Sequence, residues 1–155
     1  MLKHLFSASN KNYCNWSPLF LRLAVGTGFI VHGWAKISRG PAGFEKLLNT
    51  IHVPFAHITS YILPGIELLG GLAIFSGIYV SMVALPLIAT MLVAMFTIQI
   101  RFGYSSVKTI GLTPNGPVFG PPGYEINLLY IAALIALMIQ GAGILSIDAF
   151  RAKKA

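Results

Sequence analysis

Ionisable side chains inside long apolar stretches are the residues of this sequence best suited to chemistry. His32 and Lys36 are four residues apart, a spacing that places both on one face of a helix. Glu67 lies in the next apolar stretch, near the expected depth of His32. A charge in such surroundings costs several kcal/mol unless it is paired or hydrated. We expect Glu67 and His32 to act catalytically by handling protons, with Glu67 either protonated or hydrogen-bonded to Lys36 or His32.

Four apolar stretches must position these side chains, and they cover residues 19–37, 58–80, 82–100 and 124–145. Each approaches the ~20 residues that a helix needs to cross ~30 Å of hydrocarbon. Backbone amides inside a bilayer must be paired within their own segment, so helices are expected. The sequence therefore predicts an all-α membrane protein, an antiparallel four-helix transmembrane bundle that forms one domain over residues 1–155.

With this arrangement, polar residues gather from mid-depth to the side of the bundle opposite the termini. They predict a polar pocket that opens to that side and binds substrate through Lys36, Gln99, Arg101, Glu125 and Asn127. Structural alternatives stay open. Arg101 and Glu125 suit an ion pair between helices, His32 suits an interhelical hydrogen bond, and Glu67 suits a purely structural partner for a cation.

A second polar pair is expected near the termini, where Arg22 and Asp148 reach similar depths and can anchor helix ends. Gly70 and Gly71 are expected to be structural, because small residues let neighbouring helices approach closely. The first helix carries a stripe at helical spacing that should face the bundle interior: Arg22, Gly26, Phe29, Gly33 and Lys36.

The connections between these stretches differ in kind. Residues 77–81 leave room only for a tight turn between the second and third helices. Residues 38–57 contain an amphipathic piece around residues 44–51, which could lie along the membrane interface. Residues 109–123 are so rich in Pro and Gly that we expect an irregular loop.

The composition excludes several classes of protein. Only 10% of the residues are charged and 55% are hydrophobic, whereas a soluble domain has about a quarter charged residues. The net charge of +7 is spread along the whole chain instead of being gathered on one face, so a lipid bilayer is the expected partner and nucleic acid is not. Cys14 is the single cysteine, so neither an internal disulfide nor a metal site is expected.

Basic residues decide the orientation only narrowly, because six lie on the side of the termini and five on the opposite side. The basic cluster at residues 151–154 favours cytoplasmic termini. Residues 1–18 lack the apolar run of a cleavable signal peptide, so the first helix should serve as an uncleaved insertion signal. We expect a multi-pass protein of the bacterial inner membrane.

Several segments together resemble the DoxX family of small membrane proteins over residues 18–150. The first helix carries residues 21–24 (Leu-Arg-Leu-Ala) and 32–36 (His-Gly-Trp-Ala-Lys), and the second carries residues 67–71 (Glu-Leu-Leu-Gly-Gly). Residues 91–94, 123–129 and 141–148 are similar to the family's later motifs. One position departs from the pattern, because Gln99 stands where many members end the third helix with a histidine.

The resemblance implies an inner-membrane protein associated with redox partners. One branch of the family is similar to the small DoxD subunit of thiosulfate:quinone oxidoreductase, and another assembles with superoxide dismutase and a sulfurtransferase. The residues themselves supply no cysteine pair, no dinucleotide-binding glycine pattern and no pair of histidines at one depth for haem. A diffusible quinone or a partner protein would therefore have to supply the redox centre.

Three functions follow from these observations. The first is a membrane subunit of an oxidoreductase complex, whose polar pocket takes a quinone or a sulfur compound and which associates with redox proteins or further copies of itself. The second is a small permease or conduit that uses the polar layer as a pathway. The third is an assembly scaffold in which the polar layer only holds the helices together. The resemblance favours the first.

Overall fold

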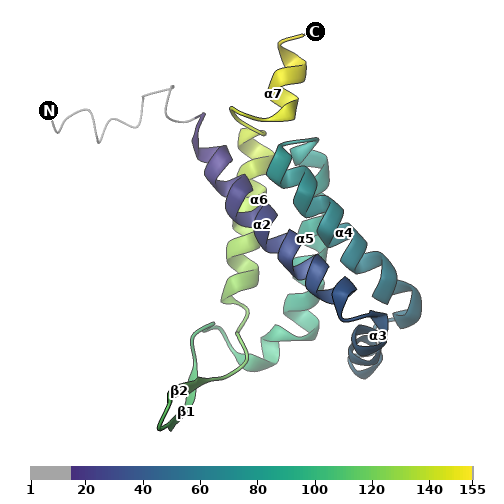
Figure 1. The fold of residues 1–155 in the computed structure, drawn as a ribbon, viewed down its shortest axis with the longest axis vertical. Coiled ribbons are helices and arrows are strands. Elements are labelled where there is room, and N and C mark those ends of the chain that lie inside the picture. Colours follow the sequence, from purple (N-terminus) through teal and green to yellow (C-terminus); the bar gives the residue numbers. More distant parts are fainter. Residues whose placement is uncertain (1–14, 155) are drawn as a thin grey trace, which may run out of the picture.

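A computed structural model describes residues 15–154 and is mostly helical (Figure 1). Its long helices are α2 (Ser17–Ser38), α4 (Ala56–Ser76), α5 (Val80–Thr97) and α6 (Glu125–Gln140). They run in alternating directions, and both the start of α2 and the C-terminal end of the chain lie at the upper end in Figure 1. Residues 1–14 lie outside the described part, so the expectations about Cys14 and about a signal peptide fall outside it too.

Glycines bring α2 and α4 into close contact. A Cβ at Gly33 would lie 2.6 Å from the backbone nitrogen of Leu68, and one at Gly71 would lie 2.7 Å from that of Ile30. Such distances leave no room for a side chain. The stripe predicted on the first helix lies on this packed side, because Arg22, Gly26, Phe29 and Gly33 are all buried.

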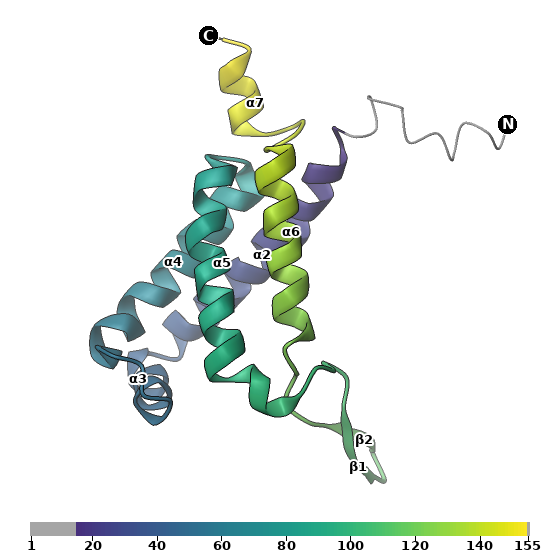
Figure 2. The same ribbon diagram turned by 180° about the vertical axis from the view of Figure 1, so that it is seen from behind.

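The turn between α4 and α5 is as tight as its length predicts. Gly77 ends α4 with a φ of 74°, and Tyr79 precedes α5 with a φ of 46°. Figure 2 shows α5 lying between α4 and α6 when the molecule is seen from behind. The core between the helices consists of aliphatic and aromatic side chains, with Phe29, Ile74, Leu87, Leu134 and Leu137 almost completely buried.

Shorter elements lie at the two ends of these helices. At the lower end in Figure 1, α3 (Pro41–Thr50) follows α2, and the 3-10 helix η2 (Gln99–Phe102) follows α5. α3 coincides with the amphipathic piece noted in the sequence. At the upper end, α7 (Ile147–Ala152) follows α6, and its first turn is capped by the Ser146 hydroxyl, which accepts from the backbone nitrogen of Ala149 at 3.0 Å.

The prediction of an irregular loop at residues 109–123 is wrong. Strands β1 (Thr109–Thr113) and β2 (Gly116–Phe119) form an antiparallel hairpin that extends away from the helices. The turn between them consists of Pro114 and Asn115, and Gly116, which pairs with Thr113 at the start of β2, has a φ of 119°. Turn residues in this order fit a hairpin. Pro117 lies within β2. A proline is tolerated there because each strand of a two-stranded hairpin has one free edge, where no backbone donor is needed.

The fourth apolar stretch is helical over fewer residues than expected. α6 ends at Gln140, because Gly141 adopts a φ of 75° and the chain then turns toward α7. Two helices of the described chain, α4 and α5, are both long and apolar enough to cross a membrane. α6 is apolar but shorter, and α2 carries Arg22, His32 and Lys36 among its 22 residues.

Candidate ligand-binding site

A cavity of about 660 Å³ lies among the long helices. Two of these helices, α2 and α6, diverge toward the lower end in Figure 1. The walls of the cavity come from α2, α4, α5 and α6, and α3 and η2 close its lower end. The volume falls within the roughly 300–1,000 Å³ of small-molecule sites. Most of the lining is apolar, and a few polar groups are set into it. They are His32, Lys36, Arg39, Glu67, Thr90, Thr97, Gln99, Asn127 and Tyr130.

An ion pair between two helices forms one wall of the cavity. Lys36 Nζ on α2 donates to both carboxylate oxygens of Glu67 on α4, each at 2.5 Å. The Glu67 side chain is 4% exposed and that of Lys36 is 28% exposed, so water reaches the pair only from the lysine side. The Lys36 ammonium also lies 5.1 Å from the centre of the Phe44 ring on α3. A carboxylate buried this deeply requires such a partner.

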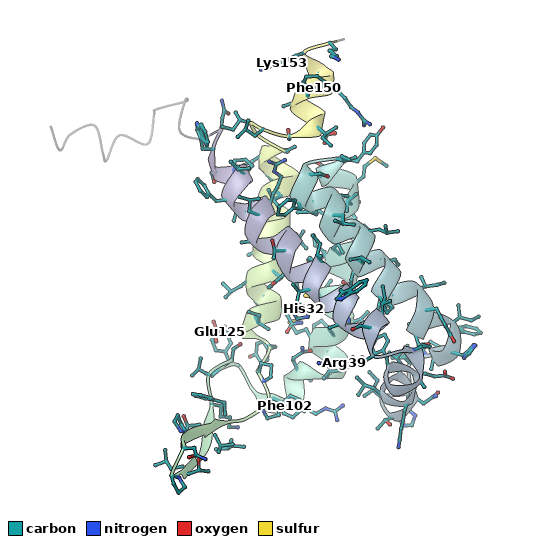
Figure 3. All side chains as sticks on the ribbon, viewed as in Figure 1. His32, Arg39, Phe102, Glu125, Phe150 and Lys153 are labelled. Carbon is teal, nitrogen blue, oxygen red and sulfur yellow. The ribbon has the colours of Figure 1, made fainter. Side chains whose placement is uncertain are left out.

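His32 lies on the open side of the same cavity. It lines the cavity from the lower half of α2 (Figure 3). The prediction that the bundle encloses His32 is wrong, because its side chain is exposed. Val31, Val93 and Ile126 border the cavity near it and are 58%, 50% and 40% exposed. The cavity therefore opens at the side of the helices, through a rim of apolar residues.

Two buried amide oxygens have no partner in the described part of the chain, and both belong to residues that line the cavity. They are Gln99 Oε1 at the end of α5 and Asn127 Oδ1 in the first turn of α6. Asn127 is 2% exposed, and its amide nitrogen donates to the backbone oxygen of Met91 at 3.3 Å. Buried acceptors of this kind are rare in proteins and are usually satisfied by water or a ligand.

Arg101 and Glu125 were also predicted to line the pocket, but neither reaches it. Arg101 is exposed and donates to the backbone oxygen of Thr97 at 2.8 Å. Glu125 lies at the lower end of α6 (Figure 3) and accepts from the backbone nitrogen of Ser106 at 3.0 Å. The predicted Arg101–Glu125 ion pair is wrong, because Arg101 bonds to a carbonyl at the end of α5 and Glu125 accepts from a loop amide instead.

The predicted Arg22–Asp148 ion pair is also absent from the described residues, although both side chains lie at the upper end. Arg22 is completely buried and its Nη2 donates to the backbone oxygens of Ile144 and Leu145 at 3.3 and 3.0 Å. Asp148 accepts instead from the backbone nitrogen of Val80, at the start of α5, at 3.4 Å. The N-terminal end of a helix attracts a carboxylate through its dipole. Arg22 therefore holds the loop before α7, and Asp148 holds α7 to α5.

Gly70 and Gly71 lie outside the cavity, at contacts between helices. Gly71 faces α2, and a Cβ at Gly70 would lie 2.9 Å from a terminal carbon of Leu87 on α5. Their position is that expected of residues that allow close packing.

Sequence reasoning missed the part that α3, and Tyr130 on α6, play in the cavity. Phe44 and Leu48 on α3 form its lower wall, and Tyr130 on α6 contributes one ring. Tyr130 also contacts Phe29 edge to face, with ring centres 5.4 Å apart. The available signal was spacing, because Tyr130 lies three residues after Asn127 and thus on the same face of α6.

The site's chemistry suits an uncharged organic ligand better than a metal ion. Among residues 15–154, no group of three or more His, Cys, Asp or Glu side chains could hold a metal. The cavity instead offers a lysine paired with a carboxylate, the exposed Arg39, two amide acceptors and an aromatic and aliphatic lining.

These features define a small helical protein with membrane-type apolar helices and a lateral cavity. The sequence model of the DoxX family matches residues 17–100, which include α2 to α5 and most of the cavity's polar groups. The chain belongs to the DoxX family, whose members are membrane-associated.

Two curated proteins are similar over most of their length. One, from Bacillus subtilis, bears the name "Putative oxidoreductase CatD"; it is 26% identical over 85% of this chain and 84% of its own. The other, an uncharacterized protein of Haemophilus influenzae, is 28% identical over 85% of this chain and 81% of its own. No solved structure matches the chain.

Proposed function

We propose that this protein is the membrane-embedded subunit of an oxidoreductase complex and that its cavity takes the ring of a quinone. In this proposal α2, α4, α5 and α6 form a four-helix transmembrane bundle in the bacterial inner membrane, with both termini cytoplasmic. Family membership and the relative named as an oxidoreductase support the general role. The quinone is our proposal for the substrate.

The observation that carries the proposal is the buried Lys36–Glu67 pair on the wall of an apolar cavity. Quinone rings are flat, apolar and uncharged, and their two carbonyl oxygens accept hydrogen bonds. Lys36 supplies a donor within the cavity, while Phe44 and Tyr130 supply aromatic surface for a ring. A purely structural ion pair would not require an open cavity beside it.

Reduction of a quinone to a hydroquinone consumes two electrons and two protons. The described residues include no group of metal ligands, so the electrons would come from a redox protein bound to the membrane subunit. His32 and Glu67 line the cavity and are the residues that can deliver protons to the two ring oxygens. Because Glu67 is paired with the Lys36 ammonium, it would first take up a proton from water and then pass it to the ring oxygen, returning to a carboxylate bound to Lys36.

The lateral opening supports a ligand with a hydrocarbon tail. Val31, Val93 and Ile126 are exposed at the rim, and in the proposed bundle they would face acyl chains. A quinone could place its ring between the helices while its tail stays in the lipid. A water-soluble substrate would gain nothing from an apolar rim.

Calorimetric titration of the full-length protein in detergent with a short-chain ubiquinone tests the proposal. We expect saturable binding that weakens by about tenfold or more in Lys36→Met, because the ring oxygen loses its donor. Lys108→Met is the matched control. Lys108 is exposed and directly precedes β1, away from the cavity, so this variant should bind like wild type. Absence of binding by folded wild-type protein, to quinone and hydroquinone alike, would reject the proposal.

A further inference from the structure

We infer that the cavity prefers the reduced ligand, a hydroquinone with two hydroxyl groups, and that Gln99 and Asn127 are the residues that recognise it. The inference rests on the proposed function, which concerns the ring but not its redox form. Its basis is the pair of buried amide oxygens that have no hydrogen-bond donor among the described residues.

The orientation of the Asn127 amide is fixed by its neighbours. Its nitrogen donates to the backbone oxygen of Met91 at 3.3 Å and lies 4.0 Å from the Met91 sulfur. A flipped amide would place two oxygens against each other at this position. Asn127 Oδ1 is therefore the atom left free, and with a residue exposure of 2% it has little access to solvent.

Gln99 lies close to the same end of the cavity. It is the first residue of η2, and the loop that follows η2 is joined to the start of α6 by backbone hydrogen bonds. The nitrogens of Gly123, Tyr124 and Glu125 donate to the oxygens of Ser105, Gly103 and Tyr104 at 3.0–3.1 Å. These bonds tie the segment that carries Gln99 to the helix that carries Asn127.

The polar neighbours in the cavity do not supply the missing donors. The hydroxyls of Thr90 and Thr97 donate to the backbone oxygens of Leu87 and Val93 at 2.8 and 2.7 Å. The other possible donors in the lining bond to neither amide oxygen; they are His32, Lys36, Arg39 and Tyr130. A ligand hydroxyl can donate to an amide oxygen, whereas a quinone carbonyl would set lone pair against lone pair. The two redox forms have nearly the same shape, so this donor is what distinguishes them.

A preference for the reduced form has a consequence for the direction of reaction. Binding the product of reduction more tightly than its substrate makes reduction of the bound quinone easier. Each tenfold preference raises the midpoint potential of a bound two-electron couple by about 30 mV. The cavity would thus draw electrons toward the bound quinone and release the hydroquinone slowly.

A series of four ligands with one ring separates the contributions. The full-length protein in detergent is titrated anaerobically with a short-chain ubiquinol, its monomethyl ether, its dimethyl ether and the matching quinone. We expect the hydroquinone to bind about ten to a hundred times more tightly than the dimethyl ether, which has the same ring but no donor. The monomethyl ether should fall between them.

Two variants identify the residues responsible. Gln99→Met and Asn127→Leu replace each amide by an apolar side chain of similar shape and remove the acceptor, so each should weaken hydroquinone binding by about tenfold. Asn127→Leu also removes the donor to the Met91 backbone oxygen. The same variants should bind the quinone as well as wild type or better, since a repulsive oxygen has gone. A variant that had merely misfolded would lose both ligands. Gln140→Met, on an exposed residue at the upper end of α6, is the control and should leave all four affinities unchanged.

The outcomes separate this inference from the proposed function. Equal binding of hydroquinone, dimethyl ether and quinone by wild type would overturn the inference, because it would mean that water satisfies the two oxygens, while the ring site would stand. Retention of the hydroquinone preference in both variants would also overturn it. Failure of all four ligands to bind would remove the proposed function itself.

Discussion

The guanidinium of Arg22 on α2 occupies the space that a side chain at position 77 would need. A Cβ built on Gly77, in the turn between α4 and α5, would collide with Arg22 Nη1 and come within 2.5 Å of the Cβ of Ser146. Three segments far apart in the sequence therefore meet at one glycine. The contact explains how a completely buried arginine is accommodated at the upper end of the helices.

Gly77→Ala should destabilise the protein by about 2–4 kcal/mol, of which roughly 1 comes from the left-handed backbone and the rest from the clash. Thermal unfolding in detergent, followed by size-exclusion chromatography, measures the loss. The same substitution in an Arg22→Ala background is the control, because alanine at position 22 empties the space that the guanidinium fills beside Gly77. There the loss caused by Gly77→Ala should shrink toward the backbone share. An unchanged loss in that background would show that the Arg22 contact is unimportant.

Glu67→Gln keeps the shape of the side chain and removes its titratable proton. If Glu67 delivers protons, membranes that contain this variant as the sole copy should reduce quinone at least about a hundredfold more slowly. The detergent-extracted variant should unfold near the wild-type temperature and still bind quinone. A wild-type rate in Glu67→Gln would exclude the proton-delivering role and leave Glu67 as the structural partner of Lys36.

Removing one member of the Lys36–Glu67 pair should cost more than removing both. Glu67→Leu leaves Lys36 without its carboxylate, and Lys36→Met leaves a buried carboxylate without a cation, at about 3–5 kcal/mol for a broken buried pair. The double variant Lys36→Met/Glu67→Leu should recover part of this loss. Unfolding of all three variants in the same detergent completes the cycle, and purely additive losses would mean that the two residues are not coupled.

Close packing of α2 on α4 should depend on Gly33. A Cβ there would lie 2.6 Å from the Leu68 nitrogen and 2.8 Å from the Pro64 oxygen, both backbone atoms that cannot easily move. Gly33→Ala should therefore destabilise the protein by about 1–3 kcal/mol. Gly65→Ala, on α4 itself but with nothing within 4 Å of its Cβ, should be neutral or slightly stabilising. A neutral Gly33→Ala would show that the two helices can separate at little cost.

The proposed topology places both termini and the turn at residues 77–81 in the cytoplasm, and the β1–β2 hairpin on the opposite side. A reporter active only in the cytoplasm should work when fused after Ala155, and an export-dependent reporter should work when inserted between Thr113 and Gly116. The reverse pattern would invert the orientation. Activity of the same reporter at both sites would show that α6 does not cross the membrane and would contradict the four-span bundle.

The helices could be anticipated from the sequence because each is a long apolar run bounded by polar or Gly- and Pro-rich segments. The residues at which the helices end were harder to predict from the sequence. The fourth helix stops at Gly141 because of a backbone conformation that an apolar count does not detect. The hairpin was missed because the same Pro and Gly residues that rule out a helix are also compatible with a tight turn between two short strands.

The sequence predicted the part of the candidate site in which residues on different helices meet because they lie at the same depth along the bundle. Helical spacing and depth brought Lys36, Glu67, Gln99 and Asn127 to one cavity. Depth alone could not pair Arg101 with Glu125 or Arg22 with Asp148, because backbone carbonyls and amides at helix ends and in loops compete for these side chains. The sequence alone does not show which backbone groups lie near a side chain, because that depends on the path of the loops and helix ends in three dimensions.

The apolar rim at Val31, Val93 and Ile126 changes how occupancy of the cavity should be counted. A tailed ligand that enters there finds the protein by lateral diffusion in a plane. Its effective concentration is then its mole fraction in the lipid, whatever the volume of buffer. Diluting a vesicle suspension leaves occupancy unchanged, whereas fusing the vesicles with ligand-free lipid lowers it. Half-saturation would accordingly be expressed in molecules of ligand per thousand lipids.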